Sequence, residues 1–184
     1  MEPDSVPLYI LVDDSRYTIN MNEYWTIVHS LLFKLADNKL KFNLIRLNFK
    51  YRNFTESVTN RERATYLLNM SPRGENPICS KLKDIFYSLN GKGSSKIIVL
   101  SPKIEESPTL VYNLRTFLPD QSYVNFVITG SDCIPSGLSR IRRVKTIQLN
   151  YSRFKALGND GIYDNILGIK LHKPKSVTMC CCIC

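Results

Sequence analysis

The sequence predicts a three-layer α/β fold, with a doubly wound, mostly parallel sheet that carries helices on both faces. Residues 8–12 and 96–100 form two short, almost wholly apolar runs, which is typical of strands buried on both faces. Segments with helical spacing of apolar residues alternate with the strand-like segments. This alternation favours parallel strands joined by right-handed crossovers.

The first half of the chain supports this prediction element by element. After the strand at 8–12, apolar residues at three- and four-residue spacing predict a helix that ends near 37–38, with Asn20 or Asn22 as its N-cap. Residues 42–49 alternate more strongly, which predicts a strand with one wetter face or a place near the sheet edge. We expect a short extra strand at 55–59 and a short helix at 64–68.

The second half repeats the alternation. Composition predicts a loop at 71–77, a helix at 78–89 and a glycine- and serine-containing turn before the strand at 96–100. The remaining predictions are helices at 109–118, 138–141 and 151–168, with strands at 123–129 and 144–149.

Length and composition indicate an ordinary globular protein. The chain has 184 residues, of which 43% are hydrophobic and 22% charged. We therefore expect a single domain over residues 1–169 and a flexible basic, cysteine-rich tail over 170–184. The acidic, proline-containing N-terminus is unlike a secretory signal, so a cytoplasmic location is the expectation. A net charge of +9 permits contact with anionic surfaces, but no nucleic-acid-binding motif accompanies it.

Polar residues follow the first strand directly. Asp13, Asp14 and Ser15 would lie at its carboxyl end, where open α/β sheets bind ligands. This strand end is therefore the first candidate for a functional site.

Residues 8–168 resemble a von Willebrand factor A (vWA) domain, particularly the compact intracellular type similar to bacterial tellurium-resistance proteins. Residues 8–17 resemble the family's first strand with its Asp-x-Ser-x-Ser motif, and 71–82 its Pro-x-Gly-x-Thr loop and following helix. Residues 96–101 fall where the family has an apolar strand that ends in Thr-Asp-Gly, and 123–138 resemble its next strand and leucine-bearing helix. The resemblance implies a protein-interaction module rather than an enzyme.

In that family the matching loops hold a divalent ion, usually Mg²⁺, in a metal-ion-dependent adhesion site (MIDAS). Here Asp13 and Ser15 match, but Tyr17 replaces the last serine of the first motif, with Thr18 one residue late. Asn76 replaces the loop threonine, and Pro102 replaces the third aspartate. We therefore expect a degenerate site without a cofactor; any residual metal would use Asp13, Ser15 and Asn76. The predicted partner-binding residues are Asp13, Ser15, Tyr17, Gly74, Asn76 and Ser101.

An alternative is a receiver-like phospho-signalling domain or another Mg²⁺-dependent enzyme using Asp13 and Asp14. A receiver needs a third aspartate at the end of a later central strand, where this chain has Ser101. The sequence contains no recognisable catalytic set, so no catalytic residue is predicted.

The tail combines basic residues with clustered cysteines. Its composition resembles that of lipidated termini, in which a lipid and a basic patch together bind membranes. The lipidation candidates are Cys180, Cys181, Cys182 and Cys184. This pattern predicts peripheral association with an anionic membrane surface, in addition to a protein partner.

Overall fold

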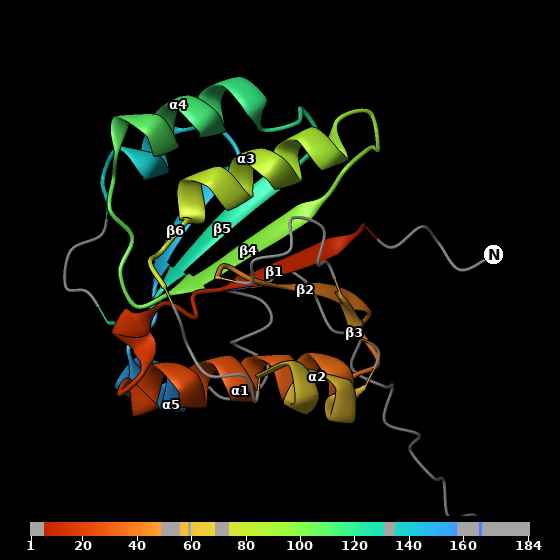
Figure 1. Ribbon diagram of the computed structural model, residues 1–184, viewed down its shortest axis with the longest axis vertical. Helices are drawn as coiled ribbons and strands as arrows, with labels where there is room; N and C mark the ends of the chain where they lie inside the picture. Colours follow the sequence, from red (N-terminus) through yellow and green to blue (C-terminus); the bar gives the residue numbers. More distant parts are fainter. Residues whose placement is uncertain are drawn as a thin grey trace, which may run out of the picture.

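The computed structural model describes residues 6–48, 56–58, 60–68, 74–130, 135–157 and 166. Its centre is a six-stranded sheet with the order β3-β2-β1-β4-β5-β6 (Figure 1). Every neighbouring pair is parallel except β2 and β3, which are antiparallel. The strands are β1 (Leu8–Val12), β2 (Phe42–Arg46), β3 (Glu56–Val58), β4 (Lys96–Ser101), β5 (Tyr123–Ile128) and β6 (Val144–Gln148).

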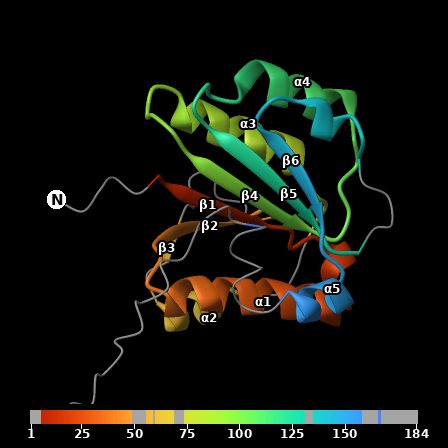
Figure 2. The same cartoon turned by 180° about the vertical axis from the view of Figure 1, so that it is seen from behind.

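Helices cover both faces of this sheet. One face carries α1, α2 and α5, and the other carries α3 and α4, as the two opposite views show (Figures 1 and 2). The helices are α1 (Asn22–Asp37), α2 (Arg61–Leu68), α3 (Ile78–Leu89), α4 (Pro108–Phe117) and α5 (Tyr151–Ala156), with 3₁₀ turns η1 (Arg16–Thr18) and η2 (Leu138–Arg140). The predicted three-layer α/β fold is confirmed.

The sheet separates two hydrophobic clusters. Ile10 of β1 packs into the cluster under α1, whereas the next residue, Leu11, packs into the cluster under α3 and α4. Both side chains have no exposed surface. The uninterrupted apolar run of β1 therefore follows from burial on both faces.

The strand order places β1 beside β4, with β2 and β5 on their outer sides. The order along the sheet thus changes direction between β1 and β4. In parallel sheets this switch point leaves a crevice at the carboxyl ends of the two strands. The residues that follow β1 and end β4 meet there.

Most predicted elements are present, with corrections at the start of α1 and at the end of the last helix. Neither Asn20 nor Asn22 caps α1. The turn η1 ends at Thr18, and the N-cap position of α1 is Met21, which makes no side-chain cap bond. For the second strand, the predicted alternative of a place near the sheet edge is confirmed, because β2 lies next to the edge strand β3. Both of its faces are covered, since Leu44 and Ile45 are buried in opposite clusters. The last helix ends at Ala156, and of the predicted remainder to residue 168 only 157 and 166 are described.

No helix among the described ranges is long and apolar enough to cross a membrane. The predicted tail, with its four lipidation candidates, lies outside the described residues.

Candidate functional site

The Asp13 carboxylate joins three separate segments at the carboxyl edge of the sheet. Its Oδ1 accepts the backbone N–H of Ser15 at 3.0 Å. Its Oδ2 accepts a bond from the Asn76 side-chain amide at 2.6 Å and lies 2.7 Å from the Ser101 hydroxyl. Asp13 is only 3% exposed. The end of β1, the end of β4 and the loop before α3 are thus held together by one buried carboxylate.

Asn76 presents a nitrogen, and not an oxygen, to Asp13. Its Oδ1 accepts the backbone N–H of Ile78 at 3.1 Å, at the start of α3. The amide oxygen is therefore used within the loop, and the Nδ2 hydrogens face the carboxylate. This orientation makes Asn76 a hydrogen-bond donor at the position where the family has a metal-ligating threonine.

Two hydroxyl groups near Asp13 behave differently. The Thr18 Oγ1 donates to the Ser15 carbonyl at 2.8 Å and so stabilises η1. Thr18 therefore does not replace the missing serine of the first motif. The Ser15 hydroxyl is fully buried and has no hydrogen-bond partner in the part of the chain that is described.

Gly74 allows the loop before α3 to approach β1. Its φ of +70° lies in the left-handed region, and a Cβ there would be 2.9 Å from the Asn48 Oδ1. Its carbonyl accepts the backbone N–H of Arg16 at 3.0 Å. The backbone conformation at residue 74 thus favours glycine, and a Cβ there would displace the Asn48 side chain.

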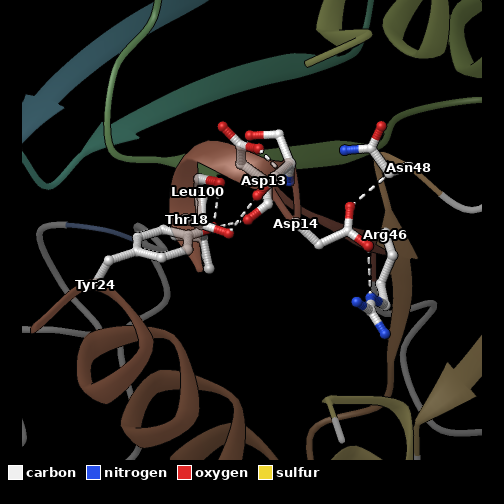
Figure 3. Close-up of polar contacts among 8 residues, drawn as sticks. Asp13, Asp14, Thr18, Tyr24, Arg46, Asn48 and Leu100 are labelled. Atoms are coloured by element: carbon white, nitrogen blue, oxygen red, sulfur yellow. Dashed lines mark hydrogen bonds and ion pairs between the residues drawn. The ribbon is translucent and has the colours of Figure 1, made fainter. Parts of the chain in front are cut away.

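Asp14 is turned away from Asp13, toward β2 (Figure 3). Its Oδ2 lies 2.8 Å from the Arg46 Nε, and its Oδ1 accepts the backbone N–H of Asn48 at 2.8 Å. Burial raises the pKa of the Asp14 carboxyl, and the bonds from Asn48 and Arg46 counteract this rise only in part. The two adjacent acids therefore serve separate networks and do not converge.

Tyr24 of α1 lies below the same strand ends. Its hydroxyl is shared between the carbonyls of Asp13, at 2.7 Å, and Leu100, at 3.1 Å (Figure 3). Burial, followed by the nearby Asp13 and Asp14 charges, raises the pKa of the Tyr24 phenol well above its ordinary value. Tyr24 thus acts as a neutral donor that ties β1 to β4.

A pocket of about 610 Å³ opens beside Asp13. This volume falls within the range of small-ligand pockets, roughly 300–1,000 Å³. Of the predicted site residues, Asp13, Ser15, Tyr17 and Asn76 line it, whereas Gly74 and Ser101 do not. Tyr17 is 63% exposed. It lies at the pocket rim.

Sequence reasoning missed the remaining pocket residues. They are Met21, Glu75, Ile78, Cys79, Pro102, Lys103, Ile104, Glu105 and Ser107. Those at 102–107 directly follow β4, so their place after a buried strand was the signal that could have found them.

Solved structures with the same arrangement are known. The SpRpn10 VWA domain is 13% identical, with 79% of this chain and 88% of that chain covered and a TM-score of 0.55. An aerotolerance-related membrane protein from Bacteroides fragilis, solved with multiple mutations to serine, is 17% identical over 90% of this chain and 100% of that one (TM-score 0.59). This chain has a von Willebrand factor A fold. No protein-family model and no curated protein matches the sequence.

A further vWA-fold neighbour is proximal thread matrix protein 1 from the mussel byssus, 16% identical with a TM-score of 0.59. The match covers 83% of this chain but only 46% of the mussel protein, so this chain spans less than half of its length. Another structure of the mussel protein has a zinc-occupied MIDAS motif. The vWA resemblance of the sequence is confirmed at the level of the fold.

The residues present fit a MIDAS-type ion poorly. Mg²⁺ requires about six oxygen ligands in near-octahedral geometry. Here an amide nitrogen faces Asp13, the Thr18 hydroxyl serves η1, and Pro102 has no side-chain oxygen. Within the described ranges, no three His, Cys, Asp or Glu side chains form a metal-binding group. What remains for an ion is the Asp13 carboxylate with the Ser15 and Ser101 hydroxyls.

Proposed function

We propose that this chain is a non-enzymatic protein-interaction module of the vWA type, with a degenerate MIDAS that works without a metal. The partner would bind at the carboxyl edge of the sheet, over the pocket beside Asp13. The vWA fold and its neighbours support a binding role. The residues proposed to bind are those predicted from the sequence, together with the pocket walls after β4.

One observation carries this proposal. The Asp13 carboxylate is satisfied by donors of the chain itself, from Ser15, Asn76 and Ser101. A carboxylate that accepts such bonds stabilises the loops without needing a cation. These hydrogen bonds support a binding edge whose loops are connected by the chain itself.

Calorimetric titration with Mg²⁺ and Mn²⁺ tests the metal-free part. We expect no stoichiometric heat with either ion. Clear one-to-one binding that disappears in Asp13→Ala would overturn the proposal.

Site-specific crosslinking tests the binding surface. A photoreactive phenylalanine analogue would replace Tyr17, at the pocket, or Tyr123, which starts β5 at the amino edge of the sheet. Both tyrosines are exposed, at 63% and 53%. We expect a discrete crosslinked partner from position 17 in extracts of the source cells and none from position 123. Equal labelling from both positions would contradict a partner site at the carboxyl edge.

The enzyme alternative has less support. A phospho-acceptor mechanism needs converging carboxylates, whereas Asp14 pairs with Arg46 and β4 ends at Ser101. Incubation with acetyl phosphate and intact-mass measurement would separate the two functions. A labile phosphate adduct would favour the enzyme.

We further propose that the module is cytoplasmic and tethered to an anionic membrane face through its basic, cysteine-rich segment. The proposal rests on the sequence of residues 170–184, where basic residues precede Cys180, Cys181, Cys182 and Cys184. An acyl chain and a basic patch together give stable membrane binding, while one alone is marginal. Mass spectrometry of this peptide from the source cells would reveal the lipid, and unmodified thiols throughout would refute the tether.

A further inference from the structure

The pocket beside Asp13 carries negative charge on a basic protein. Three acids and one base line it: Asp13, Glu75, Glu105 and Lys103. The Lys103 Nζ lies 2.9 Å from the Glu105 Oε1, so these two charges offset one another. Neither Asp13 nor Glu75 forms a salt bridge within the described part of the chain. The net charge of the pocket lining is therefore negative, although the whole chain has a formal charge of +9.

Arg16 is a second cation close to these acids, although it does not line the pocket. The Arg16 side chain lies against the Tyr17 ring, with its guanidinium carbon 5.3 Å from the ring centroid. Arg16 is not among the pocket-lining residues. Arg16 interacts electrostatically with Glu75 from outside the pocket, so Lys103 and Arg16 together offset part of the charge of the three acids.

A second observation points to a missing hydrogen-bonding group. The Ser15 hydroxyl lines this pocket, is fully buried, and has no partner among the described residues. It makes no capping bond to η1 either. A buried hydroxyl without a partner is costly, so its presence here is explained best by a ligand group that reaches it.

The pocket walls suit a long, partly apolar side chain. Met21, Ile78 and Ile104 provide apolar surface in the pocket lining. Lysine and arginine bury an aliphatic stem along such walls while their charged ends remain hydrogen-bonded. The charged end would meet Asp13, Ser15 and Glu75.

We propose that this pocket receives a lysine or arginine side chain of the protein partner. This inference rests on the proposed function, because it assigns the chemistry of the group that enters the same pocket. A bound metal ion would make the site positive and would attract a carboxylate. Without one, the net negative charge of the pocket lining and the acceptor capacity of the Ser15 hydroxyl favour a cationic donor.

The test is a ¹⁵N NMR titration of the full chain with three blocked tripeptides, acetyl-Gly-X-Gly-amide with X as Arg, Lys or Glu. We expect saturable shifts at the amides of Ser15, Asn76 and Glu105 with the Arg or Lys peptide. The Glu peptide should produce none, with or without Mg²⁺. Tighter binding of the Glu peptide, or the absence of saturable shifts with both cationic peptides, would overturn the inference.

Three variants make the result specific to the pocket. Glu75→Gln removes an exposed carboxylate and should weaken the binding of the cationic peptide about twofold to fivefold, as expected for one surface charge pair. Ser15→Ala should weaken it by at least about threefold, because a hydrogen bond to a charged group is lost. Asp84→Asn, an exposed acid on α3 outside the pocket, is the control and should change nothing. Equal weakening in the control would show a general charge effect and refute the site.

The failure of this inference is distinguishable from failure of the proposed function. If position 17 crosslinks a partner while the cationic peptides do not bind, the pocket chemistry is wrong and the interaction module stands. If position 17 captures no partner, the proposed function itself fails.

Discussion

The Asn76 side-chain amide donates a 2.6 Å hydrogen bond to Asp13, across 63 positions of sequence. The same carboxylate oxygen lies 2.7 Å from the Ser101 hydroxyl, 88 positions away. These contacts join the ends of β1 and β4 to the loop before α3. In this chain the Asp13 carboxylate therefore connects three segments of the carboxyl edge by hydrogen bonds.

Asp13→Ala should destabilise the protein by about 2–5 kcal/mol, because it leaves several buried donors without an acceptor. The measurement is urea unfolding followed by circular dichroism. Asp84→Ala removes an exposed acid of α3 and should stay within about 0.5 kcal/mol of the parent. If the two variants unfold at the same urea concentration, the hydrogen bonds of Asp13 do not stabilise the protein.

The two serine hydroxyls near Asp13 should respond oppositely to removal. The Ser101 hydroxyl lies 2.7 Å from both the Asp13 carboxylate and the Lys103 carbonyl, so Ser101→Ala should cost about 1–2 kcal/mol. Ser15→Ala removes a buried hydroxyl without a described partner and should leave the free energy of unfolding unchanged or slightly higher. A large loss of stability in Ser15→Ala would reveal a structural role and weaken the inferred ligand contact.

The buried pair of Asp14 and Arg46 should show strong coupling. Arg46→Met removes the 2.8 Å ion pair and should cost about 3–5 kcal/mol, because a buried charge loses its counter-ion. Adding Asp14→Asn removes that charge and keeps an acceptor for the Asn48 N–H. The double variant should therefore be less destabilised than the sum of the single variants. Additive losses in a double-mutant cycle would contradict direct coupling.

The pH dependence of the Arg46→Met variant follows from the raised pKa of Asp14, caused first by burial. A folded-state pKa above the ordinary 3.8 means that the folded protein binds more protons than the unfolded chain just above that pH. The contribution of Asp14 to stability thus falls as pH rises through this window. As the pH falls toward this window, the difference in free energy of unfolding between Arg46→Met and the parent should become smaller. A difference that grows on acidification would show that Asp14 is not the group responsible.

The architecture was predictable because burial on both faces leaves a simple trace in the sequence. The apolar runs of β1 and β4, each followed by polar residues, locate the switch point and place Asp13 near Ser101 before any coordinates are known. The helical spacing in Ile78–Leu89 similarly predicted α3 to the residue.

The details of the site were not predictable, since they depend on the register between strands. Val12 pairs with Arg46 across β1 and β2, which brings that arginine beside Asp14. A single arginine in an alternating strand otherwise indicates a solvent-facing position. The orientation of the Asn76 amide depends in the same way on the turn into α3, because its oxygen accepts a hydrogen bond from the backbone N–H of Ile78.

Gly74→Ala should be more harmful than Gly91→Ala, although both glycines have a positive φ. At Gly91 a Cβ meets nothing within 4 Å, so only backbone strain of about 1–2 kcal/mol is expected. At Gly74 the Cβ would also lie 2.9 Å from the Asn48 Oδ1, which should add about 1 kcal/mol. Urea unfolding of both variants measures the difference. Adding Asn48→Ala to both variants should abolish the difference in stability between them. A difference that persists would show that the extra loss in Gly74→Ala comes from another contact.

His29 should make the protein less stable in mild acid. The side chain is half-buried on α1 between Trp25 and Phe33, with ring centroids 6.1 and 5.6 Å away. Burial lowers its pKa below the ordinary 6.5, so the folded protein binds fewer protons than the unfolded chain as pH falls through that value. This contribution to the free energy of unfolding is therefore complete above about pH 7 and is lost on acidification.

His29→Phe removes the titrating group and keeps an aromatic ring between Trp25 and Phe33. Urea midpoints of the parent and the variant at about pH 7.5 and about pH 5.5 measure the effect, and the variant should lose less stability between the two. His172→Phe leaves the same number of histidines as His29→Phe, since the chain has two, and is the matched control. It should retain the pH dependence of the parent. If His29→Phe retains it as well, the acid sensitivity arises elsewhere and the lowered pKa of His29 does not control it.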